Sequence, residues 1–221
     1  MKKILLAITN FKKEKYLERA IRSCEAQIPN GIIINIIVVN DGSKEFNYKK
    51  IKSEFPEIKI INYKKNQGVS YASNKALFST NSDYFMRVDA DDYISMKTCL
   101  ILSTFLDENP SIPFVYGDIL LIKKNFTKEK ILRNQRMKLL EHGAGIMFRS
   151  YQLKKIGGYN ESLKNCEDFD LIIKVEKKFN KGFYIPYSYY KYYKDSNHSL
   201  SKKKNRKKIL NSLKKKYEKY L

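Results

Sequence analysis

The sequence predicts an α/β fold in which a mixed central sheet is flanked by helices and followed by a basic helical tail. Strand-like and helix-like segments alternate over residues 1–115, which is the pattern of a doubly wound sheet. Polar or acidic residues follow three of these strands, at the edge where such sheets bind ligands. The 221 residues, 43% of them hydrophobic, suffice for one such domain but hardly for two.

The first half of the chain contains four short apolar segments that we interpret as buried strands, at residues 3–9, 32–39, 58–61 and 83–88. The segment 32–39 is rich in β-branched residues, as expected of a strand that is buried on both faces of a parallel sheet. Between and after the strands, apolar residues at three- and four-residue spacing predict helices at residues 16–28, 68–80 and 96–106.

The second half of the chain is less regular. Strands are predicted at residues 114–123, 143–148 and 183–193, and helices at residues 167–179 and 206–221. The basic stretch 124–140 is expected to be a connection without regular structure. The small residues Gly143, Ala144 and Gly145 predict that another segment approaches this strand closely.

The charge of the chain favours anionic partners. Lys and Arg number 44 against 23 Asp and Glu, which gives a formal net charge of +21 and excludes an acidic buffer-type protein. Residues 202–221 hold ten basic residues and one acid, and so contribute +9 of this charge. The helix expected there also has an apolar stripe, which either rests on an anionic membrane surface or packs on the domain.

The cysteines and the hydropathy indicate a reducing compartment. The three cysteines are far apart and form no CxxC pair, so neither a disulfide framework nor a zinc site is predicted. The apolar run at residues 4–8 is too short for a signal peptide, and no stretch approaches ~20 apolar residues. We therefore expect a cytoplasmic protein, with peripheral contact to the inner face of the membrane if its tail binds there.

The acidic cluster of Asp89, Asp91 and Asp92 is the sharpest local feature. Three carboxylates within four residues repel one another unless water solvates them or a cation neutralises them. Oxygen ligands of this kind suit Mg²⁺ or Mn²⁺, particularly when a bound phosphate completes the coordination. The alternative is a solvated turn that precedes the next helix.

Two further acidic positions are candidates for chemistry. Asp41 follows a buried strand and can accept hydrogen bonds from a nucleotide base or ribose, or else cap a turn. Glu167 and Asp168 open a helix, where acids are stabilised by the helix dipole. A carboxylate held at that place can also serve as a general base for an acceptor hydroxyl.

Taken together and in this order, the motifs resemble those of the family 2 glycosyltransferases, which have the GT-A fold. The resemblance covers about residues 2–200 and rests on these segments: Thr9-Asn10-Phe11, Val38-Val39-Asn40-Asp41-Gly42-Ser43, Asn66-Gln67-Gly68-Val69-Ser70, Val88-Asp89-Ala90-Asp91-Asp92, Gly157-Gly158-Tyr159 and Cys166-Glu167-Asp168-Phe169-Asp170. Asn40 and Ser73 depart from residues that are common in the family, Asp and Arg respectively.

The resemblance implies roles for the nucleotide half of the site. Thr9, Asp41 and Asp89 would bind the base and ribose of the donor. Asp91 would hold Mn²⁺ or Mg²⁺ against the diphosphate, although Asp92 can also be matched to the family's metal-binding aspartate. On the acceptor side, the resemblance implies that Asp168 is the catalytic base, and that Glu167 and His198 contact substrate.

The function implied by the resemblance is an inverting, metal-dependent transfer of a sugar, with a UDP-sugar favoured as donor, to a hydroxyl of a saccharide or lipid-linked saccharide. Such a reaction belongs to surface polysaccharide or glycolipid synthesis. Residues 1–115 would form the nucleotide-sugar half and 116–200 the acceptor half of a domain spanning 1–200, with 201–221 as a basic amphipathic helix.

Two other functions were weighed against it. A nucleotidyltransferase can also use a metal-binding aspartate on an α/β sheet, but the first strand leads into no glycine-rich phosphate loop. A basic, tyrosine-rich chain can bind nucleic acid without catalysis, but that function leaves the acidic motifs unused.

Overall fold

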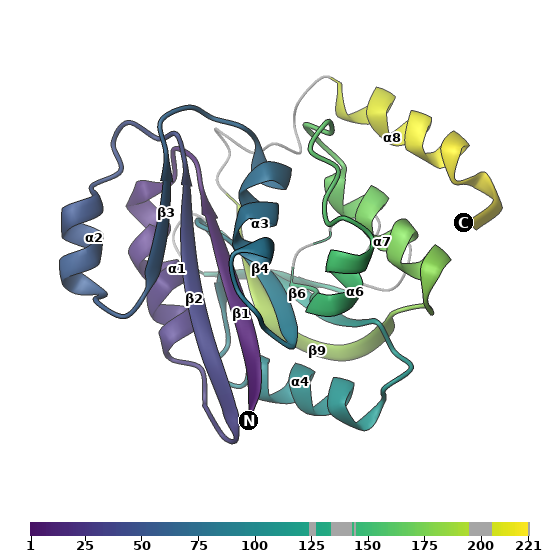
Figure 1. Ribbon diagram of the computed structural model, residues 1–221, viewed down its shortest axis with the longest axis horizontal. Coiled ribbons are helices and arrows are strands. Elements are labelled where there is room, and N and C mark those ends of the chain that lie inside the picture. The colour runs from purple at the N-terminus through teal and green to yellow at the C-terminus, as the bar shows by residue number, and fades with distance from the viewer. Residues whose placement is uncertain (124–126, 134–142, 144, 195–204, 221) are drawn as a thin grey trace.

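A computed structural model of the protein describes residues 1–123, 127–133, 143, 145–194 and 205–220 (Figure 1). Its strands form one mixed sheet in the order β3-β2-β1-β4-β8-β6-β9-β5, and β7 pairs with β6 outside this path. The strands are β1 (Lys2–Asn10), β2 (Ile32–Asp41), β3 (Lys59–Tyr63), β4 (Tyr84–Asp89), β5 (Tyr93–Ile94), β6 (Phe114–Ile122), β7 (Lys128–Leu132), β8 (Met147–Arg149) and β9 (Phe183–Tyr193). The helices are α1 (Glu14–Glu25), α2 (Tyr48–Glu54), α3 (Val69–Phe78), α4 (Thr98–Glu108), α6 (Ser150–Lys155), α7 (Glu167–Lys178) and α8 (Arg206–Lys216), followed by a 3-10 turn, Glu218–Tyr220.

Helices cover both faces of the sheet, which confirms the predicted α/β class. Alternate residues of β1 enter two different cores: Ile4, Leu6 and Ile8 pack with α1 and α4, whereas Leu5 and Ala7 pack with α3, α6 and α7. A strand that is buried on both faces in this way reads as a nearly continuous apolar run, as the sequence of β1 does.

The parallel register of the first four strands brings polar residues to one edge of the sheet. Thr9 of β1 lies opposite Val39 of β2 and Asp89 of β4. Asp41 ends β2 two residues beyond Val39, on the same edge. The candidate binding residues Thr9, Asp41 and Asp89, which are far apart in the sequence, therefore lie at the same edge of the sheet, as predicted from the sequence.

After residue 115 the expected strand at 143–148 is observed as β8, Met147–Arg149, and the helix α6 and the strand β7 were not predicted. Residues 128–132 of the expected irregular connection form β7, which pairs antiparallel with β6. This strand is polar because β6 is its neighbour on one side only, and edge strands commonly carry charged residues. The sequence KEKIL therefore lacks the apolar run by which the buried strands were recognised.

The basic helix α8 packs on α7, as Figure 1 shows. Leu213 and Tyr217 of its apolar stripe are each 5% exposed and enter the same core as Phe169 of α7. The Tyr217 hydroxyl donates a hydrogen bond of 2.6 Å to Asp170, whose carboxylate also forms an ion pair with Lys174. The stripe is thus covered by the protein itself, and lysines remain on the outer side of the helix.

In the part of the chain that the structure describes, none of the helices is long and apolar enough to cross a membrane.

The contact between α7 and α8 leads to a prediction on stability. Tyr217→Phe keeps the ring but removes the hydroxyl donor from a fully buried carboxylate, and hydrogen bonds to charged groups contribute about 1.5–3 kcal/mol. We expect urea denaturation at pH 7 to show a loss of about that size in the free energy of unfolding. Tyr220→Phe, at an exposed position of the following turn, is the control and should change it little; equal losses in the two variants would contradict this account.

Candidate functional site

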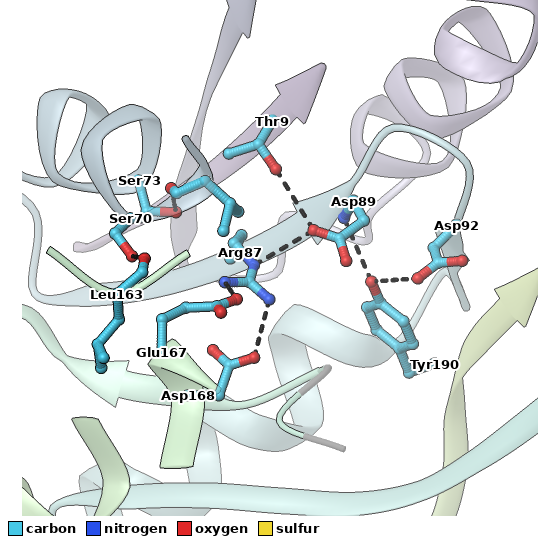
Figure 2. Close-up of polar contacts among 11 residues, drawn as sticks. Thr9, Ser70, Ser73, Arg87, Asp89, Asp92, Leu163, Glu167, Asp168 and Tyr190 are labelled. Atoms are coloured by element: carbon cyan, nitrogen blue, oxygen red, sulfur yellow. Dashed lines mark hydrogen bonds and ion pairs between the residues drawn. The ribbon is translucent and has the colours of Figure 1, made fainter. Parts of the chain in front are cut away.

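A buried arginine joins the sheet to helix α7 at the centre of the site (Figure 2). The Arg87 side chain, on β4, is 9% exposed. Its guanidinium forms ion pairs with three carboxylates: Nε with Asp89 at 3.2 Å, Nη1 with Glu167 at 3.2 Å and Nη2 with Asp168 at 2.9 Å. Arg87 therefore holds the end of β4 to the start of α7, although Arg87 and Glu167 are 80 residues apart in the sequence.

Burial within this cluster, where one guanidinium faces three carboxylates, raises the pKa of Asp168. Burial is the largest cause, and the charges of Glu167 and Asp89 add to it, whereas Arg87 acts in the opposite direction. The result is a pKa of about 7. A carboxylate with that pKa can take up a proton near neutral pH, as a general base must.

The backbone around Asp168 is adapted to hold it closely. Cys166, just before α7, has the left-handed φ of 60°, which is uncommon for a residue other than glycine. Gly143 lies directly against Asp168: a Cβ atom at residue 143 would be 2.2 Å from the Asp168 Cβ. Gly145 packs in a similar way on the Tyr190 side chain. The predicted close approach to this glycine-rich segment is thereby confirmed at both glycines.

The acidic turn after β4 gives its aspartates different environments. Asp92 is 1% exposed and accepts two hydrogen bonds of 2.8 Å, one from the Tyr190 hydroxyl and one from the backbone N–H of Tyr193. Burial, together with the charges of Asp91 and Asp89, raises its pKa well above the ordinary value. Asp92 therefore anchors the turn on β9, whereas the Asp91 side chain is still 21% exposed.

Asp91 forms an ion pair with Lys13, which precedes α1. The Lys13 Nζ lies 2.7 Å from Asp91 Oδ2, and the two side chains are 15% and 21% exposed. Burial raises the pKa of Asp91, although Lys13 opposes this shift and Asp89 adds to it. The turn itself is fixed by the Arg19 guanidinium, which donates to the backbone carbonyl of Asp91.

The donor set of this turn fits a hard divalent cation with few protein ligands. Asp91 is partly exposed, and Thr9 and Arg87 both bind Oδ1 of Asp89, so that Oδ2 of Asp89 faces the site without a partner among the described residues. Within those residues there is no group of three or more His, Cys, Asp or Glu side chains placed to hold a metal. A cation on Asp91 would therefore complete its shell with water or ligand phosphates, which is the way Mg²⁺ is usually bound.

Asp41 holds the loop at residues 66–68 through hydrogen bonds to its carboxylate. It is 3% exposed, and its carboxylate accepts three hydrogen bonds of 2.8 Å, from the Asn66 side chain and from the backbone N–H groups of Gln67 and Gly68. The neighbouring Gly42 has a φ of +81°, and a Cβ there would lie 2.5 Å from the Asn66 nitrogen. Asp41 thus fixes the loop that leads into α3, and about one of its four acceptor positions is left for a ligand.

The structure brings most of the candidate residues together. Thr9 donates a 3.3 Å hydrogen bond to Asp89, and Asp89, Glu167 and Asp168 share Arg87 (Figure 2). Asp91 lies on the turn that follows Asp89, and Asp41 ends β2, which β1 separates from β4. His198 lies outside the described residues.

Sequence reasoning missed Arg87 and Lys13. A signal was present for the first, because a charged residue within the strand YFMRVD requires a buried partner. No comparable signal marks Lys13, which is one of 44 basic residues.

Comparison with known proteins bears on the family and the fold of the chain. The model of the family "Glycosyl transferase family 2" matches residues 6–166. An uncharacterized glycosyltransferase of Haemophilus influenzae is 25% identical over 151 residues, which are 63% of this chain and 51% of that protein. The teichoic acid poly(glycerol phosphate) polymerase of Staphylococcus epidermidis is 26% identical over 202 residues, 82% of this chain and 27% of that protein. The chain thus spans about half the length, or less, of these two relatives.

Among solved structures, TarS 1–349 of S. aureus in complex with UDP-GlcNAc superposes with a TM-score of 0.75 at 20% sequence identity. The match covers 92% of this chain and 61% of that one. At this identity the likeness establishes the fold, and it confirms the predicted GT-A architecture.

The role of Asp41 can be tested by Asp41→Asn, which retains the shape but replaces one carboxylate oxygen by an NH2 group that cannot accept the hydrogen bond from the N–H of Gln67 or of Gly68. We expect a loss of about 1–3 kcal/mol in the free energy of unfolding from urea titrations. Asp83→Asn, which removes the same charge next to a solvent-exposed hydrogen bond to the N–H of Lys3, is the control. A loss no larger than that of the control would show that the loop does not depend on Asp41.

Proposed function

This chain belongs to glycosyl transferase family 2, and from that premise we propose that it moves a sugar from a nucleotide-diphosphate donor to a hydroxyl of a saccharide acceptor. The observation that carries the proposal is the pairing of Asp168 with Arg87. It places a carboxylate with a pKa of about 7 beside Asp89, at the carboxyl edge of the parallel strands. Ligands of open α/β sheets bind at that edge.

Asp168 is the base of the proposed reaction. Its unprotonated carboxylate accepts the proton of the acceptor hydroxyl as the oxygen attacks the anomeric carbon and the bond to the diphosphate breaks. Glu167 is committed to Nη1 of Arg87 and so keeps the guanidinium aligned beside Asp168. A single base and a single displacement give inversion at the anomeric carbon. A retaining reaction by double displacement needs a second carboxylate as nucleophile.

Thr9, Asp41 and Asp89 bind the nucleotide in this proposal. Asp89 presents its second oxygen to a ribose hydroxyl, while Thr9 and Arg87 hold the first. Asp41 contributes its remaining acceptor position and the ordered loop before α3. A UDP-sugar is favoured as donor, in line with the TarS structures that contain UDP and UDP-GlcNAc.

Asp91 would hold Mn²⁺ or Mg²⁺, which would neutralise the charge that develops on the departing diphosphate. The reason for choosing Asp91 over Asp92 is their burial. Both oxygens of Asp92 already accept hydrogen bonds from β9, whereas the Asp91 side chain is 21% exposed and pairs with the side chain of Lys13.

The acceptor is proposed to be a saccharide or lipid-linked saccharide of a surface polysaccharide, bound by the half of the domain at residues 116–200, with Glu167 and His198 on the substrate side. Relatives include chondroitin synthase and hyaluronan synthase of Pasteurella multocida, and the net charge of +21 suits an anionic polymer. Contact of the tail with an anionic membrane would be electrostatic, through its outward lysines, since Leu213 and Tyr217 are buried.

Donor binding can be tested by calorimetry of the full chain with UDP, CDP, GDP and dTDP, with and without Mn²⁺. We expect binding of UDP that requires Mn²⁺ and that Asp91→Ala weakens by more than about tenfold, because the cation links the diphosphate to the protein. Glu57→Gln, at an exposed position in the loop before β3, is a control for the loss of one acid. If no nucleotide binds and RNA binds in a salt-sensitive manner, the proposed function is wrong and a nucleic-acid-binding function takes its place.

The role of Asp168 can be tested by its variant and by pH. Asp168→Asn keeps an acceptor for Arg87 but cannot take a proton, so we expect turnover to fall by about 10²–10⁴-fold with nucleotide affinity little changed. In the wild type the active form is unprotonated, so kcat/KM should fall about tenfold per pH unit below a midpoint near pH 7. The rate at which nucleoside diphosphate is released from the donor measures both the turnover of the variant and the pH dependence of the wild type. A midpoint near pH 4, the ordinary range of a carboxyl, would argue against Asp168 as the base.

A further inference from the structure

Lys13 is placed against the acidic turn in a way that the proposed reaction leaves unused. It lies in the loop between β1 and α1, and its ammonium is 2.7 Å from Asp91 Oδ2. Both side chains are largely enclosed, at 15% and 21% exposure. An ion pair in such a place is less screened by water and salt than a pair on the open surface.

Both partners are held by contacts of their own. The neighbouring Lys12 has a left-handed φ of 57°, and its backbone N–H donates a 2.6 Å hydrogen bond to the Ser43 hydroxyl, which fixes the loop on the end of β2. The carbonyl of Asp91 is bound by the Arg19 guanidinium. Three tyrosine rings surround that guanidinium at 4.7–5.5 Å from their centroids: Tyr16, Tyr93 and Tyr193. The pair is thus set by the fold and is no chance contact of two mobile side chains.

We propose that Lys13 is an internal competitor of the divalent cation at Asp91. The inference rests on the proposed function, in which Asp91 is the metal ligand. A cation bound to the Asp91 carboxylate at about 2.1 Å would lie within a few ångströms of the Lys13 ammonium, and the two positive charges repel each other strongly at that range. The cation therefore binds Asp91 only when Lys13 turns away.

The diphosphate of the donor is the group that can receive Lys13 when it leaves Asp91. An ammonium is a compact phosphate-binding charge on a flexible stem, so Lys13 can move from carboxylate to phosphate without a change in the backbone. It follows that the cation binds weakly to the free protein and tightly together with the nucleotide. Lys13 thereby makes the binding of the two interdependent.

The test uses Mn²⁺ alone, with no nucleotide, and counts free Mn²⁺ by electron paramagnetic resonance in titrations of the full chain. Lys13→Met and Lys13→Gln remove the ammonium. We expect each to bind Mn²⁺ at least about tenfold more tightly than the wild type, a change that corresponds to 1.4 kcal/mol. Lys13→Arg should stay as weak as the wild type. Lys15→Met, two residues along at an exposed position above the Tyr16 ring, is the matched control and should change nothing.

Three results would overturn the inference. The first is an Mn²⁺ affinity that is unchanged or lower in both neutral variants while their melting temperatures match that of the wild type. The second is tighter Mn²⁺ binding that persists when Lys13→Met is combined with Asp91→Asn, and the third is that no variant binds Mn²⁺. Calorimetry with UDP separates this failure from that of the proposed function. If UDP binds with Mn²⁺ but Lys13 has no effect on Mn²⁺ alone, only the competition is wrong, whereas a protein that binds no nucleoside diphosphate fails the proposed function itself.

Discussion

The site depends on one buried guanidinium that has more carboxylates around it than it can neutralise. Arg87 holds the end of β4 to the start of α7, because its three pairs lie on both segments. Removing one member of a buried ion pair commonly costs 3–5 kcal/mol, so the cluster constrains the fold as well as the chemistry. Burial of the cluster raises the pKa of Asp168 to about 7, and the charges of Glu167 and Asp89 add to this shift while Arg87 opposes it. The same contact therefore provides both the geometry and the proton affinity of the candidate base.

The close contacts around this cluster explain residues that carry no chemistry themselves. Gly143 leaves room for Asp168, and Gly42 leaves room for the loop that Asp41 clamps. Helix α8 supports α7 through Tyr217 and Asp170, two residues beyond Asp168. The basic helix is thus joined to the helix that carries the candidate base, which is the second of the two arrangements that its apolar stripe predicts.

Most of the strands and helices in the first half of the chain could be predicted, because buried parallel strands have apolar sequences and their polar ends stand out; the short elements α2 and β5 lack such a pattern. Thr9, Asp41 and Asp89 were found in this way, and their common edge follows from parallel register. The polar edge strand β7 could not be predicted in this way, because its sequence has no apolar run and resembles that of a connecting loop. The basic partners of the acidic residues could not be predicted either. Arg87 and Asp168 are 81 positions apart in the sequence, and Lys13 and Asp91 come into contact only in the folded chain.

The three aspartates of the acidic turn show why residue type and spacing do not determine a role. Asp92 lies in the interior, where a tyrosine hydroxyl and a backbone N–H occupy its oxygens, and it can only hold the turn in place. Asp89 shares one oxygen between Thr9 and Arg87, and its position is therefore fixed while its other oxygen faces the site. Asp91 pairs with the Lys13 ammonium at 2.7 Å, and in the proposed competition it is the aspartate whose partner is exchanged. An exchangeable charge suits a place where a charged ligand arrives and departs, and a fixed charge suits a place where that ligand must be oriented. In the proposed function, the environments that the fold gives to these three identical side chains would therefore assign them different parts in binding the donor.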